Sequence, residues 1–210
     1  MPADPTQDLA LMAELMAGRD SALDLLMERW EGPLRSFAHR YLQNATDTDE
    51  VVEETFVRVY HKRADFIPGS NFSAWIFTIA ANLCRHRLRW RRRHPSESID
   101  IPDGDGVPGL GSTLASAGAD PAVATEGNER IAALRAAVAA LPEEQRSVFL
   151  LHSYEGMSYR DIAAVVGCSE RGVETRLYRA RQALRDLLAP LLAVAGGRPV
   201  PASAPRPAVA

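Results

Sequence analysis

The stretch SYRDIAAVVGCSERGVETRLYRAR, residues 158–181, decides how the second half of the chain folds. Ser158 can cap a helix, with Asp161 three positions further on, and Gly167 supplies the tolerance of positive φ that a sharp turn needs. Ser169 can then cap a second helix. The pattern predicts a helix-turn-helix rather than a plain amphipathic hairpin with a solvated basic face.

The second helix of this motif separates an apolar face, with Val173, Leu177, Leu184 and Leu188, from a polar face. In helix-turn-helix proteins this helix enters the major groove, where its first residues reach base edges and basic residues bind phosphates. The residues predicted to face DNA are Ser169, Arg171, Glu174, Thr175, Arg176, Tyr178, Arg179 and Arg181. Within this set, we expect base contacts from Arg171, Glu174 and Thr175 and phosphate contacts from Arg176, Arg179 and Arg181.

Apolar residues at helical spacing extend through most of the remaining chain. Strand-like alternation and internal repeats are not found, so the expected fold class is all-α, with two small helical domains joined by a flexible linker. The helices that the spacing predicts cover about residues 9–16, 22–41, 52–60, 72–93, 131–141, 142–154, 158–166 and 169–188.

Composition changes sharply between the two helical halves. Pro, Gly, Ser, Ala and Asp dominate from His94 to about Thr125, and Lys and Arg are absent between Arg93 and Arg130. Such a segment cannot build a core of its own. We therefore expect four parts: a helical domain at 8–94, a flexible acidic linker at 95–125, a helix-turn-helix domain at 126–190 and a disordered tail at 191–210.

The remaining composition excludes several classes of protein. Cys84 and Cys168 are far apart and belong to no CxxC or Cys/His cluster, so the sequence predicts neither a zinc site nor a disulfide framework. The sequence suggests no cofactor. The N-terminus lacks a signal peptide, and the longest apolar stretch is too short to span a membrane. We expect a cytoplasmic protein that is not an enzyme.

The net charge of −3 hides two segments of opposite sign. Five carboxylates stand where the helix predicted at 52–60 begins, which suits the positive end of the helix dipole: Asp47, Asp49, Glu50, Glu53 and Glu54. Six arginines stand at the end of the next predicted helix: Arg85, Arg87, Arg89, Arg91, Arg92 and Arg93. We call these six the arginine run, and such a run favours a polyanionic partner over a merely solubilising surface.

Two blocks of the chain resemble a known family. The segments DEVVEETFVRVYHKRADF (49–66) and NFSAWIFTIAANLCRHRLRWRRR (71–93) resemble domain two of the extracytoplasmic-function sigma factors of bacterial RNA polymerase. The segment ALPEEQRSVFLLHSYEGMSYRDIAAVVGCSERGVETRLYRARQALRDLL (140–188) resembles their domain four. The resemblance implies a four-helix bundle and a helix-turn-helix domain that direct polymerase to promoters.

The resemblance also assigns roles to residues of the first half. The acidic helix would dock on the clamp helices of the polymerase largest subunit through Asp49, Glu50, Glu53, Glu54 and Phe56. The loop at 66–71 and the helix after it would bind and open the −10 promoter element through Asn71, Asn82, Arg85, His86, Arg89 and Trp90. Trp75 lies on the apolar side of that helix, so we expect it in the core. The helix-turn-helix would read the −35 element.

Two further expectations follow only from the resemblance. The linker would thread the RNA channel of polymerase, and an anti-sigma factor would mask one or both domains. The sequence does not show the promoter, the inducing signal or the type of anti-sigma factor.

Two other functions compete with this interpretation. A conventional helix-turn-helix regulator would need a sensing pocket or a dimer face in its first half, which instead has an acidic helix, a turn loop and an arginine-rich helix. A nuclease would need carboxylates clustered around a metal. The acidic group at 47–54 has no partner His and lies on a helix face that we expect to be exposed.

Overall fold

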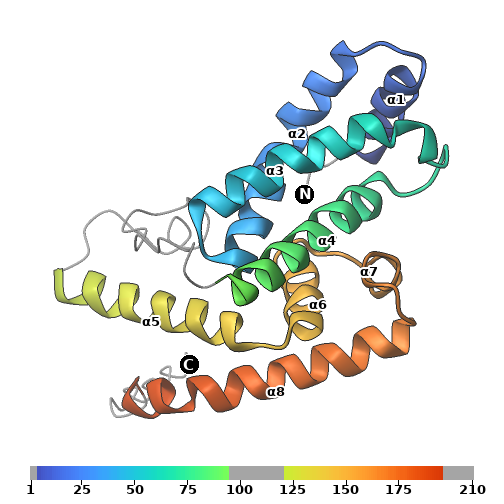
Figure 1. The fold of residues 1–210 in the computed structure, drawn as a ribbon. Helices are drawn as coiled ribbons and strands as arrows, with labels where there is room; N and C mark the ends of the chain where they lie inside the picture. The colour runs from blue at the N-terminus through green and yellow to red at the C-terminus, as the bar shows by residue number, and fades with distance from the viewer. Residues whose placement is uncertain (1–3, 95–120, 196–210) are drawn as a thin grey trace, which may run out of the picture.

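The computed structural model describes residues 4–94 and 121–195, and all regular structure within these ranges is helical (Figure 1), which confirms the all-α fold class. The helices in chain order are α1 (Pro5–Met16), α2 (Ser21–Leu42), α3 (Ala45–His61), the short 3-10 helix η1 (Arg63–Asp65), α4 (Phe72–Arg93), α5 (Pro121–Ala140), α6 (Glu143–Ser153), α7 (Tyr159–Val166) and α8 (Glu170–Ala195).

Helices α1 to α4 pack around an aromatic core. Phe77 meets Phe37 edge to face, with ring centroids 5.3 Å apart, and meets Trp30 at 6.0 Å. The indole nitrogen of Trp30 donates to the buried carboxylate of Asp8 at 3.1 Å, which ties α1 to α2. Helix α2 continues through Pro33. Burial of these large rings is the main force that assembles this half.

Helices α5 to α8 form the second half around aliphatic side chains that continue the hydrophobic core of the first half. Val148 and Leu151 on α6 and Ile162 on α7 are fully buried, as is Val173 on α8. Helix α6 packs on α7 and α8, and α5 packs on α8. This core is built from branched side chains at helical spacing, as the sequence pattern predicted.

The ends of the expected linker and tail are helical. Helix α5 begins at Pro121, inside the segment assigned to the linker, and α8 continues through Pro190 to Ala195. Proline is accepted at the first helical position, and alanine is the strongest helix former, so the Ala-rich sequence after Pro121 extends the helix. The other residues assigned to the linker and tail, 95–120 and 196–210, lie outside the described residues.

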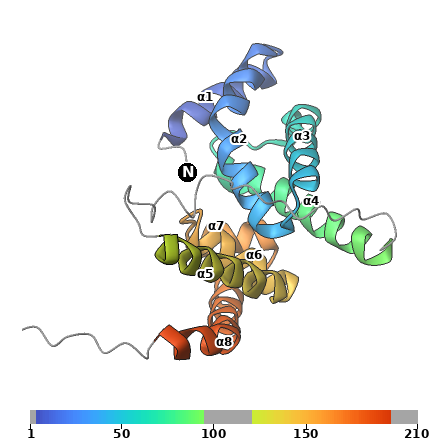
Figure 2. The same cartoon turned by 90° about the vertical axis from the view of Figure 1, so that its left-hand side faces the viewer.

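The two halves pack directly against each other. Helix α7 lies on α4, and α5 and α6 contact α2 (Figures 1 and 2). A helix long and apolar enough to cross a membrane does not occur in the part of the chain that the structure describes.

A buried carboxylate lies at this contact between the halves. Glu155, between α6 and α7, is 6% exposed, and the nearest cation is the Arg40 guanidinium of α2, whose Nη1 lies 3.9 Å from its Oε1. Burial raises the pKa of Glu155 to about 7, and the charge of Arg40 opposes part of that rise. Glu155 therefore binds its proton more tightly in the folded chain than in the unfolded chain.

We expect Glu155→Gln to stabilise the protein above neutral pH. A pKa raised from 4.5 to about 7 gives stability that is complete below pH 4.5 and is lost as the pH rises through 7. Urea unfolding at pH 8 should show the variant more stable by about 1–3 kcal/mol, with the difference shrinking toward pH 5. A difference between variant and parent that does not change with pH would contradict this assignment.

Candidate nucleic-acid interface

The helix-turn-helix forms as the sequence predicted. The backbone N–H of Asp161 donates to Ser158 Oγ at 3.2 Å at the start of α7, and the N–H of Gly172 donates to Ser169 Oγ at 3.1 Å at the start of α8. Gly167 ends α7 with φ +68°, a conformation that favours glycine. Cys168 is half-buried in the turn, and its thiol donates to the Ser169 carbonyl.

Helix α8 presents a polar face beside α6. Val173, Leu177 and Leu184 are buried, whereas Leu188 is only half-buried. Tyr178 is 66% exposed, although it is a large aromatic residue. In all, seven of the eight residues predicted to contact DNA are exposed: Ser169, Arg171, Glu174, Thr175, Tyr178, Arg179 and Arg181. The eighth, Arg176, is partly buried because its guanidinium pairs with Glu144 Oε2 at 2.8 Å.

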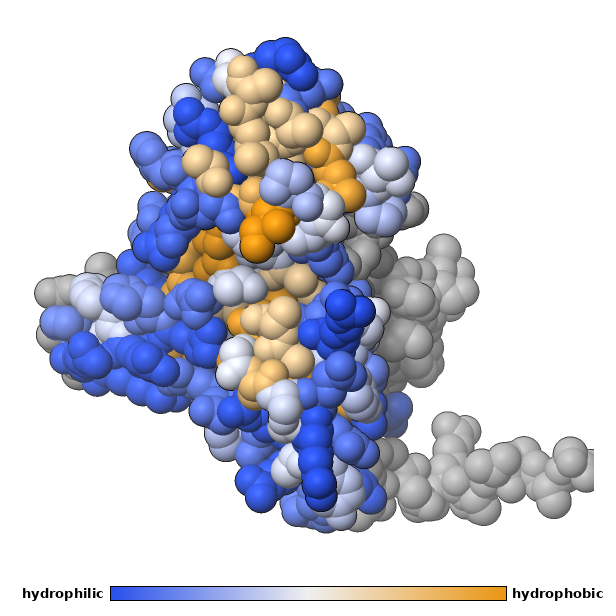
Figure 3. Space-filling model, turned by 90° about the vertical axis from the view of Figure 1, so that its right-hand side faces the viewer, coloured by the Kyte–Doolittle hydropathy of each residue, from blue (hydrophilic) through white to orange (hydrophobic). Residues whose placement is uncertain are grey.

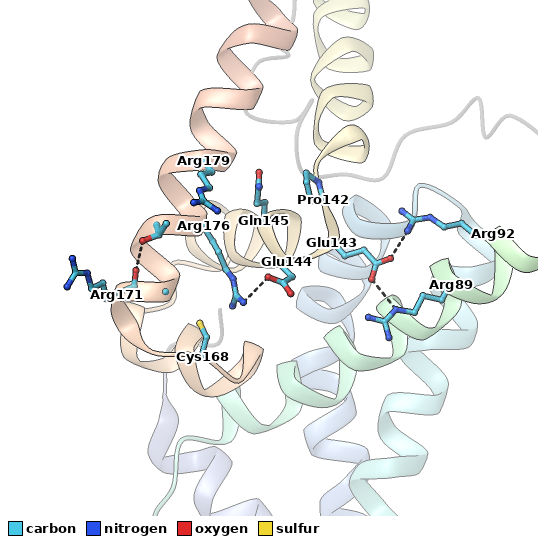
Figure 4. Close-up of a pocket in the computed structure, with 12 residues that line it drawn as sticks. Arg89, Arg92, Pro142, Glu143, Glu144, Gln145, Cys168, Arg171, Arg176 and Arg179 are labelled. Carbon is cyan, nitrogen blue, oxygen red and sulfur yellow. Dashed lines mark hydrogen bonds and ion pairs between the residues drawn. The ribbon is translucent and has the colours of Figure 1, made fainter.

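A cleft of about 770 Å³ separates this face from the arginine run on α4 (Figure 4). Arginines from both helices line it: Arg89, Arg92, Arg171, Arg176 and Arg179. Two consecutive glutamates at the start of α6 stand between them, with Glu143 bound to Arg89 and Arg92 and Glu144 bound to Arg176. The cleft is therefore lined by cationic side chains of both helices that are predicted to bind a promoter, α4 at the −10 element and α8 at the −35 element.

The loop before α4 is short and anchored by aromatic rings. Phe66 is buried and stacks edge to face on Trp75 at 5.2 Å, so Trp75 packs against the core as expected. The turn beyond it is closed by a hydrogen bond from Ser70 N–H to the Ile67 carbonyl at 3.0 Å. Ile67 is 72% exposed, and Figure 3 shows apolar side chains on the side of the molecule where Figure 1 places this loop and α7.

Asn71 has two roles in the structure. Its Oδ1 accepts from the N–H of Ala74 at 3.3 Å, which caps α4. Its Nδ2 donates to Asp161 Oδ1 of α7 at 2.9 Å. Asn71 is exposed, and its side-chain amide is hydrogen-bonded to the other half of the chain.

Four of the six arginines in the arginine run bind carboxylates on neighbouring helices, and they point in two directions. Arg87 and Arg91 turn toward α3, where their nitrogens lie 2.6 and 3.4 Å from the buried carboxylate of Asp47. Arg89 and Arg92 turn toward α6 and meet Glu143 at 3.3 and 2.8 Å. These four guanidinium groups are therefore held in fixed directions by carboxylates on α3 and α6.

The other predicted −10 residues lie along α4. Asn82 and His86 are exposed, and Arg85 donates to the Asn82 side chain. The Trp90 ring is partly buried, stacked on His94 at 4.8 Å with the Arg87 guanidinium 5.2 Å from its centroid. Trp90 therefore exposes only part of its ring.

The acidic helix α3 presents four of its five predicted contact residues. Asp49, Glu50 and Glu53 are exposed and Glu54 is half-exposed, with Glu50 bound to Arg87 and Glu54 to Arg58, both at 2.8 Å. Phe56 is 3% exposed and packs in the core, so it does not present the surface that we expected. Val57, which is 42% exposed, lines a groove of about 320 Å³ with Glu50, Glu53 and Glu54.

Sequence reasoning missed the carboxylates that hold these arginines. Asp47 was predicted only as part of an acidic helix start, and Glu143 and Glu144 lie in the first turn of the helix predicted at 142–154. Their position after Asn44 and Pro142 is a helix-start signal, and it carries no information about partners on another helix. In the described residues, His, Cys, Asp and Glu form no group that could hold a metal ion.

The capped helices α7 and α8, the turn at Gly167 and the exposed basic face of α8 define a DNA-binding helix-turn-helix protein, and α4 is a second basic helix. The sequence matches the family models "Sigma-70 region 2" over residues 26–94 and "Sigma-70, region 4" over residues 131–184. The chain belongs to the sigma-70 family of RNA polymerase sigma factors, within its extracytoplasmic-function group.

Curated relatives share this organisation along most of their length. The RNA polymerase sigma-H factor of Pseudomonas aeruginosa is 31% identical, and the match covers 89% of this chain and 96% of that protein. The ECF RNA polymerase sigma factor EcfG of Rhodopseudomonas palustris is 37% identical over 74% of this chain and 78% of its own length.

Solved structures of similar fold include complexes with a second protein. The structure of CnrH in complex with the cytosolic domain of CnrY matches with a TM-score of 0.65 at 29% identity, covering 88% of this chain and 99% of that chain. The sigma factor RpoE in complex with the anti-sigma factor NepR from Bartonella quintana matches with a TM-score of 0.57 at 28% identity, covering 79% and 97%.

We expect Asp47→Asn to lower the free energy of unfolding much more than Asp49→Asn does. Asp47 is buried and bridges to two arginines of α4, so the neutral amide leaves their charges without a carboxylate. Its loss should lower the free energy of unfolding in urea by about 2–4 kcal/mol. Asp49 pairs with Arg35 at the surface, with 61% of its side chain exposed, and its loss should cost less than about 1 kcal/mol. Equal losses for the two variants would contradict a bracing role for Asp47.

Proposed function

We propose that this chain binds core RNA polymerase in the cytoplasm, directs it to promoters that carry a −35 and a −10 element, and helps to open the DNA at the −10 element. The observation that carries the proposal is the pair of basic helices in the correct family domains, α4 in region 2 and α8 in region 4. The chemistry is binding and strand separation, and the chain itself performs no covalent step.

Recognition of the −35 element is assigned to the exposed face of α8. Arg171, Glu174 and Thr175 occupy the first turns, where the second helix of a helix-turn-helix reaches base edges. Arg179 and Arg181 follow on the same exposed surface and suit phosphate contacts, which position the helix without reading sequence. Arg176 joins them once it is released from Glu144.

Opening of the −10 element is assigned to the loop at 66–71 and to α4. An opened strand needs a surface that receives unstacked bases and cations that hold its phosphates. The exposed Ile67 and the neighbouring Asn71 offer a surface for unstacked bases. The cations that hold the phosphates are Arg85, Arg89 and Arg92. Asn82, His86 and the exposed part of Trp90 complete the proposed surface.

Docking on core polymerase is assigned to the groove beside α3. Glu50, Glu53 and Glu54 give it negative charge, and Val57 gives it an apolar wall in place of the buried Phe56. Asp49 lies on the same helix and is exposed. We further propose an anti-sigma factor as a regulatory partner, because one of the similar solved structures is described as a sigma factor in complex with an anti-sigma factor.

The decisive experiment combines the purified chain with core polymerase that lacks any sigma subunit. Transcripts from fragmented genomic DNA of the host should start at sites that share a −35 and a −10 element. A chain that binds duplex DNA in a salt-sensitive way but does not bind core polymerase would instead be a conventional helix-turn-helix regulator.

We expect Arg171→Ala and Arg179→Ala to have different effects on promoter binding. Loss of a base contact at Arg171 should weaken holoenzyme binding by about 1–3 kcal/mol and relax sequence preference at one position of the −35 element. Loss of a phosphate contact at Arg179 should weaken binding to all sequences by a similar factor. It should also reduce the slope of log K against log salt concentration by about one. Arg185→Ala, further along α8 beside Gln182, is the matched control and should leave both quantities unchanged.

We expect Glu53→Lys to reduce core binding by about tenfold, because it reverses a charge in the docking groove. Fluorescence anisotropy of the labelled chain titrated with core polymerase measures this affinity. Glu28→Lys makes the same charge change at an exposed position of α2 and serves as the control. An equal loss for both variants would mean that the effect reflects net charge and not the groove.

A further inference from the structure

The polar face of α8 carries one arginine whose charge is already paired. Arg176 Nη2 lies 2.8 Å from Glu144 Oε2 of α6, and both residues line the cleft (Figure 4). The side chain of Arg176 is 26% exposed and that of Glu144 is 67% exposed. The other arginines of this face, Arg171, Arg179 and Arg181, are exposed, and no carboxylate of the described residues pairs with them. Arg176 therefore differs from its neighbours on α8 in having an anionic partner.

The position of Arg176 suits a DNA phosphate as well as it suits this carboxylate. Arg176 precedes Arg179 by three residues, so the two side chains leave α8 on the same side, about 4.5 Å apart along the helix axis. Both line the cleft beside α6. A DNA backbone that reaches Arg179 therefore passes close to Arg176, whose guanidinium is already bound by Glu144.

The corner from which Glu144 projects is fixed by buried hydrogen bonds. Glu144 lies in the first turn of α6, where the helix dipole also favours a carboxylate. Two residues later, Arg146 is 3% exposed and donates to the carbonyls of Ala139 and Leu141 around the end of α5. Helix α6 also packs on α8. The backbone that carries the Glu144 carboxylate is therefore held in place relative to Arg176.

We propose that Glu144 is a positioning residue that lowers the affinity of the helix-turn-helix for DNA, because its carboxylate competes with phosphate for the Arg176 guanidinium. Contact with DNA exchanges one anion for another at Arg176, so this arginine adds little to binding, whereas Arg179 adds a full phosphate contact. Both partners of the ion pair belong to the α5–α8 half, so the competition does not depend on how the two halves are arranged.

The competition acts on all DNA sequences alike. Phosphate contacts position a protein on the duplex and carry no sequence information, so Glu144 lowers affinity without changing which bases are preferred. An exposed ion pair changes an equilibrium constant by about two- to fivefold, which sets the size of the effect. This inference rests on the proposed function for its consequence at promoters, although the restraint on the Arg176 side chain can be measured in the free chain.

The first experiment measures the affinity of the reconstituted holoenzyme for a promoter fragment and for a fragment of scrambled sequence. Glu144→Gln keeps the size of the side chain and removes its charge. Its affinity should rise about two- to fivefold on both fragments, and the slope of log K against log salt concentration should steepen by about one. Asp186→Asn makes the same charge change at an exposed position of α8 and is the control. It should leave both quantities close to the parent values.

A double-mutant cycle then asks whether Glu144 acts through Arg176. Arg176→Ala should weaken DNA binding less than about twofold in the parent chain, and by about two- to fivefold more than that in the Glu144→Gln chain. A gain from Glu144→Gln that persists in full in the Arg176→Ala chain means that the glutamate only repels DNA, and it overturns the proposal. A loss from Arg176→Ala in the parent chain as large as that from Arg179→Ala also overturns it.

The restraint itself is measured in the free full chain by nitrogen-15 NMR relaxation of the arginine Nε groups. The order parameter of Arg176 should be higher than that of Arg179, and Glu144→Gln should lower it to the value of Arg179. Equal order parameters for the two arginines in the parent chain overturn the restraint. Failure of core polymerase to bind the chain overturns the proposed function, while the relaxation data still decide whether Glu144 holds Arg176.

Discussion

The ion pair between Arg87 Nε and Asp47 Oδ1, 2.6 Å long and mostly buried, fixes the orientation of α4, the described helix with the largest net charge, against α3. Helix α4 has six arginines and no carboxylate of its own, and repulsion within the arginine run opposes a regular helix there. Asp47 binds Arg87 and Arg91 on the side of the run that faces α3. Arg89 and Arg92 point outward from α3, toward α6 and the cleft.

The same constraint explains why the two halves meet where they do. The outward arginines need anions, and the first turn of α6 supplies Glu143. That pairing places the start of α6 beside the end of α2, where the Arg146 guanidinium finds backbone carbonyls in both halves. Apolar burial then closes the contact between α4 and α7. The arginines of α4 thus determine where the two halves contact each other, and apolar burial stabilises that contact.

Local rules in the sequence predicted most of the helices, caps and turns. Ser158, Gly167 and Ser169 act as the pattern predicted because capping and positive φ depend on a few neighbouring residues. Most of the predicted DNA-facing residues of α8 are exposed for the same reason, since helical periodicity separates its two faces. Phe56 was assigned to the polymerase-docking surface from the family resemblance, yet its position in the turn directs it into the core.

The pairing across helices could not be read from the sequence, because it depends on distances between segments far apart in the chain. Glu143 follows Arg92 by 51 positions and Asp161 follows Asn71 by 90, and their spacing carries no periodic signal. Acidic residues at helix starts have a sufficient local explanation in the helix dipole, so nothing in the pattern calls for a second role. The structure gives Glu143 both roles at once: it favours the start of α6 and binds two arginines of another helix.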